Sequence, residues 1–155
     1  MTIKLASLKA DLDREEKGDW IDYPDWPGVS FLVSSLQKPA YVTARDMMMQ
    51  RFARQYKGKP VPRDVLLPAL GKLFAQHILH GWRGLDVDYD RDVALQTLTD
   101  PAYRDVVTAV EHCAARVSEL ELEFVEDEAK NSVRPSGVFR SEEHTSELQS
   151  LRHLV

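Results

Sequence analysis

Apolar residues recur at spacings of three and four along most of the chain, which is the period of an amphipathic helix. Pro39 begins one such stretch and Gly58 follows its end, while Asp64 precedes a second stretch that Gly81 closes. Asp100, followed by proline, is a strong start signal for a further helix. The pattern predicts helices over five stretches: 3–17, 39–56, 64–80, 93–99 and 101–124.

One part of the chain has a different pattern and predicts a β-hairpin. Residues 19–23 and 29–33 are rich in aromatic and β-branched side chains, which favour strands. Residues 24–28, Pro-Asp-Trp-Pro-Gly, form a turn-like sequence between them. The expected packing residues of the hairpin are Trp20, Tyr23 and Phe31. Together the patterns predict a mainly α (α+β) fold, in which a small N-terminal β-hairpin or sheet is followed by a bundle of about four helices.

The composition narrows the class of protein. The chain has 155 residues, a net charge of −5 and 43% hydrophobic residues, which is typical of one globular domain. Its one cysteine, Cys113, excludes an intrachain disulfide and an all-cysteine zinc site. No stretch approaches the length of about 18 apolar residues that a membrane helix needs, and residues 1–9 lack the apolar core of a signal peptide. We therefore expect a protein of the reducing cytoplasm with no membrane partner.

The acidic loop 86–92 places aspartates at alternate positions, as calcium-binding loops do. The match then fails, because Arg91 stands where such loops need glycine and Thr97 stands where they need a glutamate. The expected structure is a solvated loop that caps the next helix.

Two sets of side chains raise the question of an enzyme. His77 and His80 are three residues apart, and a metal site would need a further ligand such as His112 or Cys113. Adjacent helical residues point about 100° apart, so His112 is badly placed to take a proton from Cys113. Packed side chains are the simpler interpretation, and the sequence has no glycine-rich phosphate loop or nucleophile elbow. We expect no enzymatic activity, no metal and no cofactor; a small metal or thiol enzyme is an alternative.

The second segment of the chain is basic, since Lys38–Arg63 contains seven bases and one acid. The bases expected along one helix face, opposite its apolar stripe, are Arg45, Arg51, Arg54 and Lys57. Such a face suits nucleic acid, but no recognised nucleic-acid motif accompanies it. It equally suits the acidic stretch Glu119–Glu128, which includes the end of the last predicted helix, in this chain or in a neighbour. Nucleic acid is therefore an alternative partner, and self-association stays open.

Several motifs follow one another in a distinctive order. The main ones are Gly81-Trp82-Arg83-Gly84 and, further on, Asp100-Pro101-Ala102-Tyr103-Arg104. The 24–28 turn, with the strand that follows it, and the basic helix around 45–56 precede these motifs. An acidic stretch that ends in Glu128-Ala129-Lys130-Asn131-Ser132 follows them. Over residues 18–135 this order resembles the tail assembly chaperones of tailed bacteriophages and prophages, especially those with long non-contractile tails.

The resemblance implies a small, mainly helical, non-enzymatic protein in the cytoplasm of the infected bacterium, absent from the mature virion. Such chaperones bind the tape measure protein, keep its long hydrophobic helices soluble and help to recruit tail tube protein subunits. We therefore expect the tape measure protein and the tail tube protein as partners. The alternative is a small nucleic-acid-associated phage or bacterial accessory protein that uses the basic segment 38–63.

Candidate contact residues follow from this role. Methionine is flexible and suits adaptable surfaces, and three successive methionines, at 47–49, cannot all face one core. The expected partner-binding residues are Met47, Met48, Phe52, Tyr56, Trp82, Arg45, Arg51 and Arg54. Trp82 lies between glycines and is expected to be an anchor if it is exposed and a core residue if it is buried.

The C-terminal end differs in character from the rest. Residues 140–150, Arg-Ser-Glu-Glu-His-Thr-Ser-Glu-Leu-Gln-Ser, resemble a translated sequencing adapter, and 151–155 are compatible with its continuation. We therefore expect a single domain over residues 1–132, a flexible tail over 133–139 and a non-native, adapter-derived extension over 140–155.

Overall fold

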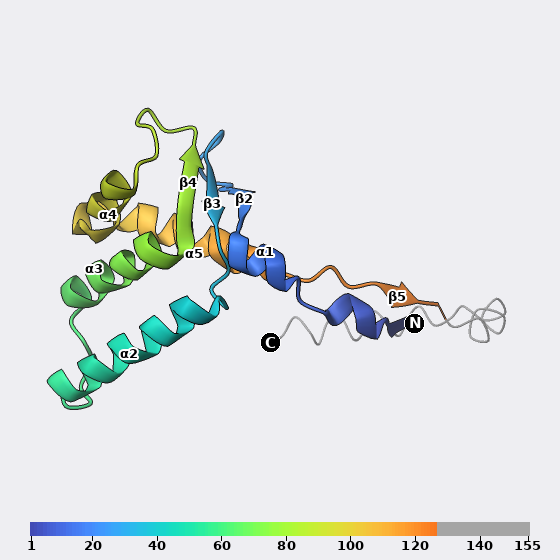
Figure 1. The fold of residues 1–155 in the computed structure, drawn as a ribbon, viewed down its shortest axis with the longest axis horizontal. Coiled ribbons are helices and arrows are strands. Elements are labelled where there is room, and N and C mark those ends of the chain that lie inside the picture. Colours follow the sequence, from blue (N-terminus) through green and yellow to red (C-terminus); the bar gives the residue numbers. More distant parts are fainter. Residues whose placement is uncertain (127–155) are drawn as a thin grey trace, which may run out of the picture. The chain divides into compact units, whose positions relative to one another are not determined.

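The computed structural model describes residues 1–126, which divide into two compact units (Figure 1). One unit is Ala10–Glu119, and the other joins Met1–Lys9 to the chain from Leu120 onward. The expected domain over 1–132 includes parts of both units. The expectations for residues 133–139 and 140–155 lie outside the described residues.

The unit Ala10–Glu119 holds most of the secondary structure. Its strands are β2 (Asp19–Asp22), β3 (Ser30–Val33) and β4 (Leu79–Arg83). Its helices are α1 (Leu12–Lys17), α2 (Pro39–Gln55), α3 (Arg63–Leu73), the π-helical turn η2 (Phe74–Ile78), α4 (Arg91–Thr99), the 3-10 turn η3 (Pro101–Tyr103) and α5 (Arg104–Val117). The described chain is mainly helical with a small antiparallel sheet near its N-terminus, so the predicted mainly α (α+β) class is confirmed.

The sheet has the strand order β2-β3-β4, with both pairs antiparallel. The predicted hairpin is β2 and β3, and its turn is closed by a hydrogen bond of 3.0 Å from the Tyr23 amide to the Val29 carbonyl. The register aligns Ile21, Phe31 and Trp82 across the three strands. The third strand, β4, was not expected from the sequence.

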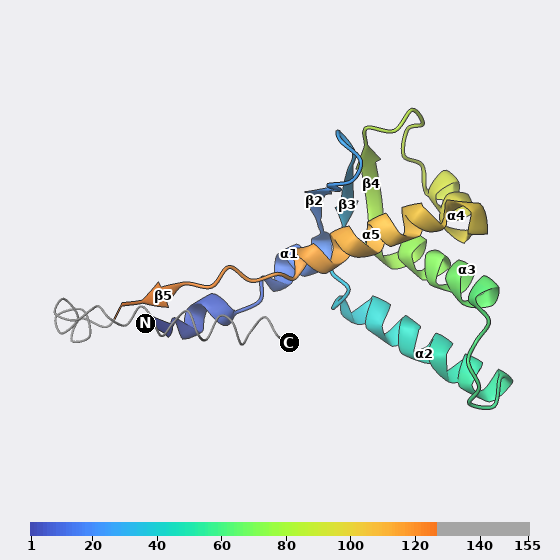
Figure 2. The ribbon, with the colours of Figure 1, turned by 180° about the vertical axis from the view of Figure 1, so that it is seen from behind.

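One face of the sheet packs on α5, which crosses the strands in Figure 2. Apolar residues recur every three or four positions along α5, with charged residues between them. The helix therefore has one apolar side, made of small and branched side chains, and buries it. Phe31 and Val33 of β3 meet this stripe in a core that also holds Phe74 and Ile78 of η2. The core therefore joins the sheet, α5 and η2.

Helix α2 runs away from the sheet and α3 returns beside it (Figure 1). The first turn of α2 contacts η2, which follows α3, and the rings of Tyr41 and Phe74 lie 5.8 Å apart there. Helix α4 crosses α3 at Gly71, where a Cβ atom would lie 1.8 Å from the Leu98 carbonyl oxygen. Only glycine permits this close approach of two backbones.

The predicted helix over 64–80 is wrong at both ends. It begins at Arg63, so Asp64 lies in its first turn and makes no side-chain cap. Pro68 lies in the helix interior. The helix gives way to β4 at Leu79, before the glycine at position 81 that was expected to close it. Segment 79–83 pairs with β3, and a bulge in the register beside Leu32 and Val33 lets both Leu79 and Trp82 lie against the core.

The predicted helix over 3–17 is also wrong. The chain instead forms β1 (Thr2–Ile3), the 3-10 turn η1 (Leu5–Leu8) and then α1, which Asp11 caps by accepting a hydrogen bond from the Arg14 amide. Three leucines lie in this segment at helical spacing, but all are exposed, so they form no buried apolar stripe: Leu5, Leu8 and Leu12. Gly18 ends α1 with a φ of 94°, a backbone conformation that glycine adopts without strain.

The predicted last helix, 101–124, splits into η3 and α5, which ends at Val117. The following chain is extended and forms β5 (Phe124–Val125), which pairs antiparallel with β1. Lys4 reinforces this ribbon through its amide, which donates to the Glu123 carbonyl over 2.8 Å, and through an ion pair of 3.2 Å to the Glu123 carboxylate. Leu120 and Phe124, which continue the helical spacing of apolar residues from Val117, are exposed.

Candidate partner-binding surface

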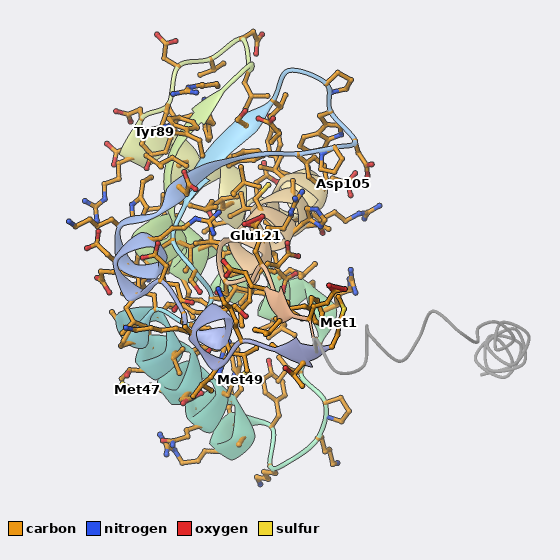
Figure 3. All side chains as sticks on the ribbon, turned by 90° about the vertical axis from the view of Figure 1, so that its right-hand side faces the viewer. Met1, Met47, Met49, Tyr89, Asp105 and Glu121 are labelled. Atoms are coloured by element: carbon orange, nitrogen blue, oxygen red, sulfur yellow. The ribbon has the colours of Figure 1, made fainter. Side chains whose placement is uncertain are left out.

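The three methionines of α2 lie on different sides of the helix. Met48 is 3% exposed and faces inward with Tyr41, whereas Met47 is 55% exposed and Met49 is 47% exposed. Positions two residues apart on a helix are rotated by about 200°, and Figure 3 shows Met47 and Met49 on opposite sides of α2. The expectation that at least one methionine is exposed is therefore confirmed. Met48 is buried, so it is not part of an accessible surface.

Met47 shares its side of the helix with two arginines. Arg51 and Arg54 follow it by four and seven positions, which places all three side chains on one face. All three are exposed, and neither arginine forms an ion pair within the described residues. We refer to Met47, Arg51 and Arg54 as the outer face of α2; it combines a flexible apolar side chain with two available cations.

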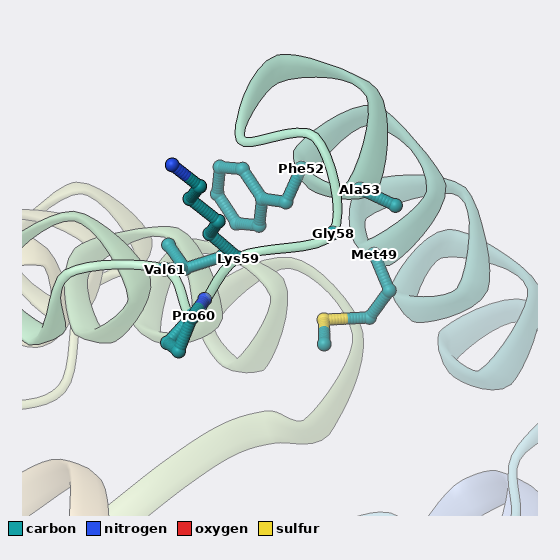
Figure 4. Close-up of a pocket in the computed structure, with 7 residues that line it drawn as sticks. All are labelled: Met49, Phe52, Ala53, Gly58, Lys59, Pro60 and Val61. Carbon is teal, nitrogen blue, oxygen red and sulfur yellow. The ribbon is translucent and has the colours of Figure 1, made fainter.

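Met49 belongs to a different surface, a notch between the end of α2 and the loop that leads to α3 (Figure 4). The notch has a volume of about 240 Å³. Its lining residues are Met49, Phe52, Ala53, Gly58, Lys59, Pro60 and Val61. We call this surface the α2–α3 notch. Tyr56, the last expected residue of the apolar stripe, is half-buried at the helix end, where its ring contacts that of Phe52 at 6.1 Å.

Arg45 does not lie with the other two arginines. Its guanidinium lies 5.8 Å from the ring centre of Tyr41, on the edge of the inward side of α2, and 3.5 Å from the carboxylate of its neighbour Asp46. The single basic face expected opposite the apolar stripe is therefore incorrect for Arg45 and holds for Arg51 and Arg54.

Trp82 is a core residue. It lies on β4 rather than on a loop and is 8% exposed. Its indole nitrogen donates a hydrogen bond of 2.7 Å to the Val87 carbonyl, and its ring meets the edge of Tyr89 with centroids 5.2 Å apart. Trp82 therefore fastens the 84–90 loop to the sheet, which selects the buried alternative for this residue.

Sequence reasoning gave no role to an aromatic–cation pair on the other face of the sheet. The guanidinium of Arg83 lies 3.7 Å from the ring centre of Trp20, which is half-buried. The Trp20 ring reaches over Gly81, where a Cβ atom would come within 3.3 Å of it. The strand register is the signal that would have found this pair. Trp20 and Gly81 both align with Leu32, and Arg83 lies two residues after Gly81 on the same strand.

The acidic loop behaves as a helix cap, as expected. A carboxylate oxygen of Asp90 accepts hydrogen bonds from the amides of Asp92 and Val93, at 2.9 and 3.3 Å. These bonds satisfy free donors in the first turn of α4. Within residues 1–126, no group of three or more histidine, cysteine, aspartate or glutamate side chains is arranged to hold a metal ion.

His77 is half-buried, as expected of a packed side chain, whereas His80 is exposed on β4 and only its contact with Ser34 is partly buried. His80 Nε2 lies 2.7 Å from the hydroxyl oxygen of Ser34, and that hydroxyl donates its own proton to the Glu16 carbonyl over 3.0 Å. The imidazole must therefore donate to Ser34, so it does not act as a base toward this hydroxyl. Burial and the nearby cations Lys38 and Arg91 lower the pKa of His80 below its usual value. Burial likewise lowers the pKa of His77.

Cys113 is fully buried on α5 against the sheet. Burial raises the pKa of its thiol to about 11, which keeps it protonated near neutral pH. Its neighbour His112 points elsewhere and meets the Tyr23 ring with centroids 5.5 Å apart. The pair thus lacks the thiolate and the adjacent base that a cysteine nucleophile requires.

No helix within the described residues has both the length and the apolar character needed to cross a membrane. No protein-family model, curated protein or solved structure matches the chain. A function assigned to the chain therefore rests on its own residues and their arrangement.

Proposed function

We propose that this protein is a tail assembly chaperone of a bacteriophage or prophage, which binds the tape measure protein in the bacterial cytoplasm and helps to recruit tail tube subunits, without enzymatic activity. The proposal draws on the order of motifs along the chain and on the surface that α2 offers. The observation that carries it is the outer face of α2, which exposes Met47 beside two arginines that form no ion pair with residues 1–126.

The motifs behind the resemblance have structural tasks in this fold. The 24–28 turn joins β2 to β3, and segment 80–84 supplies β4 with Trp82, which holds the following loop. Asp100 accepts a hydrogen bond of 2.9 Å from the Ala102 amide and so starts η3 and α5. Because these residues build the fold, contacts to a partner must come from other residues, and the outer face of α2 is available for them.

The outer face of α2 suits a helical partner. Its residues run along one side of the helix over about two turns, which is the arrangement that packs against a second helix. Methionine adapts to varied apolar stripes, and the two arginines can pair with acidic residues that flank such a stripe. The outer face of α2 therefore offers both an adaptable apolar contact and two cations to a long apolar helix that needs a soluble partner before assembly.

Co-expression with the tape measure protein encoded beside the gene tests the proposal. The wild-type chain is expected to co-purify with it, and Met47→Gln combined with Arg51→Glu and Arg54→Glu is expected to abolish capture at an unchanged melting temperature. A matched control, Lys72→Glu on α3, changes an exposed charge elsewhere and should retain capture. A wild-type chain that fails to capture any tape measure protein contradicts the proposed function; capture by the triple variant contradicts the assigned surface.

A second candidate is a nucleic-acid-associated accessory protein, which the basic segment 38–63 favours. Positions 47–63 contain bases and no acid, and Arg51, Arg54 and Lys57 are exposed. This candidate predicts retention on double-stranded DNA that falls steeply with salt. The same triple variant should lose that retention, whereas a chaperone should show no DNA retention at physiological salt.

A further inference from the structure

The α2–α3 notch has an apolar lining and a basic surround. Phe52, Met49 and Val61 line it, and in Figure 4 the side chain of Lys59 extends past the Phe52 ring. Lys57, in the same loop, is exposed and has a positive φ of 51°, so the loop turns sharply here. The volume of the notch, about 240 Å³, exceeds the roughly 150 Å³ of a cavity that accepts a benzene ring. The notch therefore suits an apolar side chain carried by an acidic segment.

Such a segment exists in the same chain. Residues 119–126 alternate acidic and apolar positions, Glu-Leu-Glu-Leu-Glu-Phe-Val-Glu, and we call them the acidic segment. Its larger apolar side chains, Leu120, Leu122 and Phe124, are 42%, 45% and 52% exposed. Only Phe124–Val125 is in a strand, so the backbone before it is not committed to a sheet.

The charges of the acidic segment are partly free. Glu119 pairs with Arg116 and Glu123 pairs with Lys4. Glu121 and Glu126 form no ion pair within the described residues and are exposed. Two carboxylates and a row of large apolar side chains are thus exposed among the described residues, and exposed apolar residues gathered in one segment are typical of an interaction site.

We propose that the acidic segment of one copy docks in the α2–α3 notch of a second copy. An apolar side chain of the segment enters the notch, and the free carboxylates Glu121 and Glu126 meet Lys57 and Lys59 at its rim. Apolar contact at the centre with opposite charges around it is the usual anatomy of a specific interface. A second copy is the occupant because the chain itself supplies both complementary surfaces.

This contact joins two different surfaces, so it is heterologous. In a pair held by one such contact, one copy keeps a free notch and the other keeps a free acidic segment. Both surfaces are used only if each copy places its segment in the notch of the other. Association should therefore depend on protein concentration, and it should weaken with salt because the ion pairs at the rim are exposed.

Size-exclusion chromatography with light scattering on the full chain alone tests the contact. At low salt the mass of the wild type should rise above the monomer with concentration and should fall back at high salt. Lys57→Glu with Lys59→Glu, and separately Glu121→Lys with Glu126→Lys, should each raise the concentration for half-association by about tenfold or more. Lys9→Glu with Arg104→Glu applies the same charge change elsewhere and should associate as the wild type does.

Mixing the two defective variants gives the decisive result. The Lys57→Glu, Lys59→Glu variant keeps an intact acidic segment, and the Glu121→Lys, Glu126→Lys variant keeps an intact notch. The two reversed surfaces are again opposite in charge, so an equimolar mixture should regain association that neither variant shows alone. Each variant should melt as the wild type does, which separates lost contact from lost folding. A wild type that stays monomeric at every concentration, or a mixture that forms no pair, overturns the proposal. Neither result bears on capture of the tape measure protein, which is measured separately.

Discussion

Replacing Trp82 with alanine separates a core residue from a partner anchor. The side chain lies on the core face of β4 and is aligned with Phe31 across the sheet. Its indole nitrogen holds the Val87 carbonyl at 2.7 Å, and its ring meets Tyr89 edge-on at 5.2 Å. Alanine removes the hydrogen bond, the aromatic contact and the buried volume in one step, and the surrounding core can only partly fill the space.

The expected cost follows from these losses. Replacing a buried tryptophan with alanine destabilises a domain by about 3–5 kcal/mol. This total includes the loss of one neutral hydrogen bond, which is worth about 1 kcal/mol. Because Trp82 is 8% exposed, we expect a loss of about 4 kcal/mol in the free energy of unfolding. In urea, with a slope of about 2 kcal/mol/M, the unfolding midpoint should fall by about 2 M.

Two controls make the result specific. Trp82→Phe keeps an aromatic ring but loses the donor to Val87, so it should cost clearly less than alanine. Met47→Ala changes an exposed side chain and should shift the free energy of unfolding by no more than about 0.5 kcal/mol. A Trp82→Ala variant whose midpoint matches that of Met47→Ala would refute the structural role. Circular dichroism in a urea series measures all three midpoints.

Three further predictions concern Gly71, Cys113 and His80. Gly71→Ala should lower the melting temperature despite alanine's higher helix propensity, because its Cβ would strike the Leu98 carbonyl; a raised melting temperature would show that α3 and α4 do not cross so closely. The thiol of Cys113 should resist iodoacetamide in the native protein and react fully once unfolded, and rapid native labelling would contradict its burial. Since the folded state lowers the pKa of His80, the unfolded chain takes up the proton first, and stability should decline as pH falls through about 6.5. His80→Gln should flatten that decline relative to the wild type, while keeping a donor for Ser34.

Local chemistry made part of the fold predictable from the sequence. The hairpin of β2 and β3 follows from two strand-forming runs around a proline- and glycine-rich turn. Helix α2 begins at Pro39, the first helical position that proline favours. Asp90 and Asp100 cap the elements that follow them. In each case the signal lies within a few residues, so no distant contact was needed to read it.

Other boundaries depend on distant partners and could not be predicted. Leu79 and Trp82 are three apart, which extends the helical spacing of α3, but they also fit a short strand with a bulge opposite β3. Leu120 and Phe124 continue the three- and four-residue spacing of α5 from Val117, yet the same residues alternate with glutamates at the period of a strand. Pairing with β3 and with β1 decides between the two periods, and both partners lie far away in sequence.

The candidate surface shows why an apolar stripe is a poor guide to a partner site. A helix attached to a domain must first use its most regular apolar stripe for that attachment, and in α2 this side includes Tyr41, Met48 and Phe52. The same side chains cannot also be fully available to a second protein. A partner must use what the stripe leaves over, which on α2 is Met47 with its neighbouring arginines on one side and Met49 at the notch on the other. Of three successive methionines, the two that do not fit the stripe are therefore the ones to test in binding.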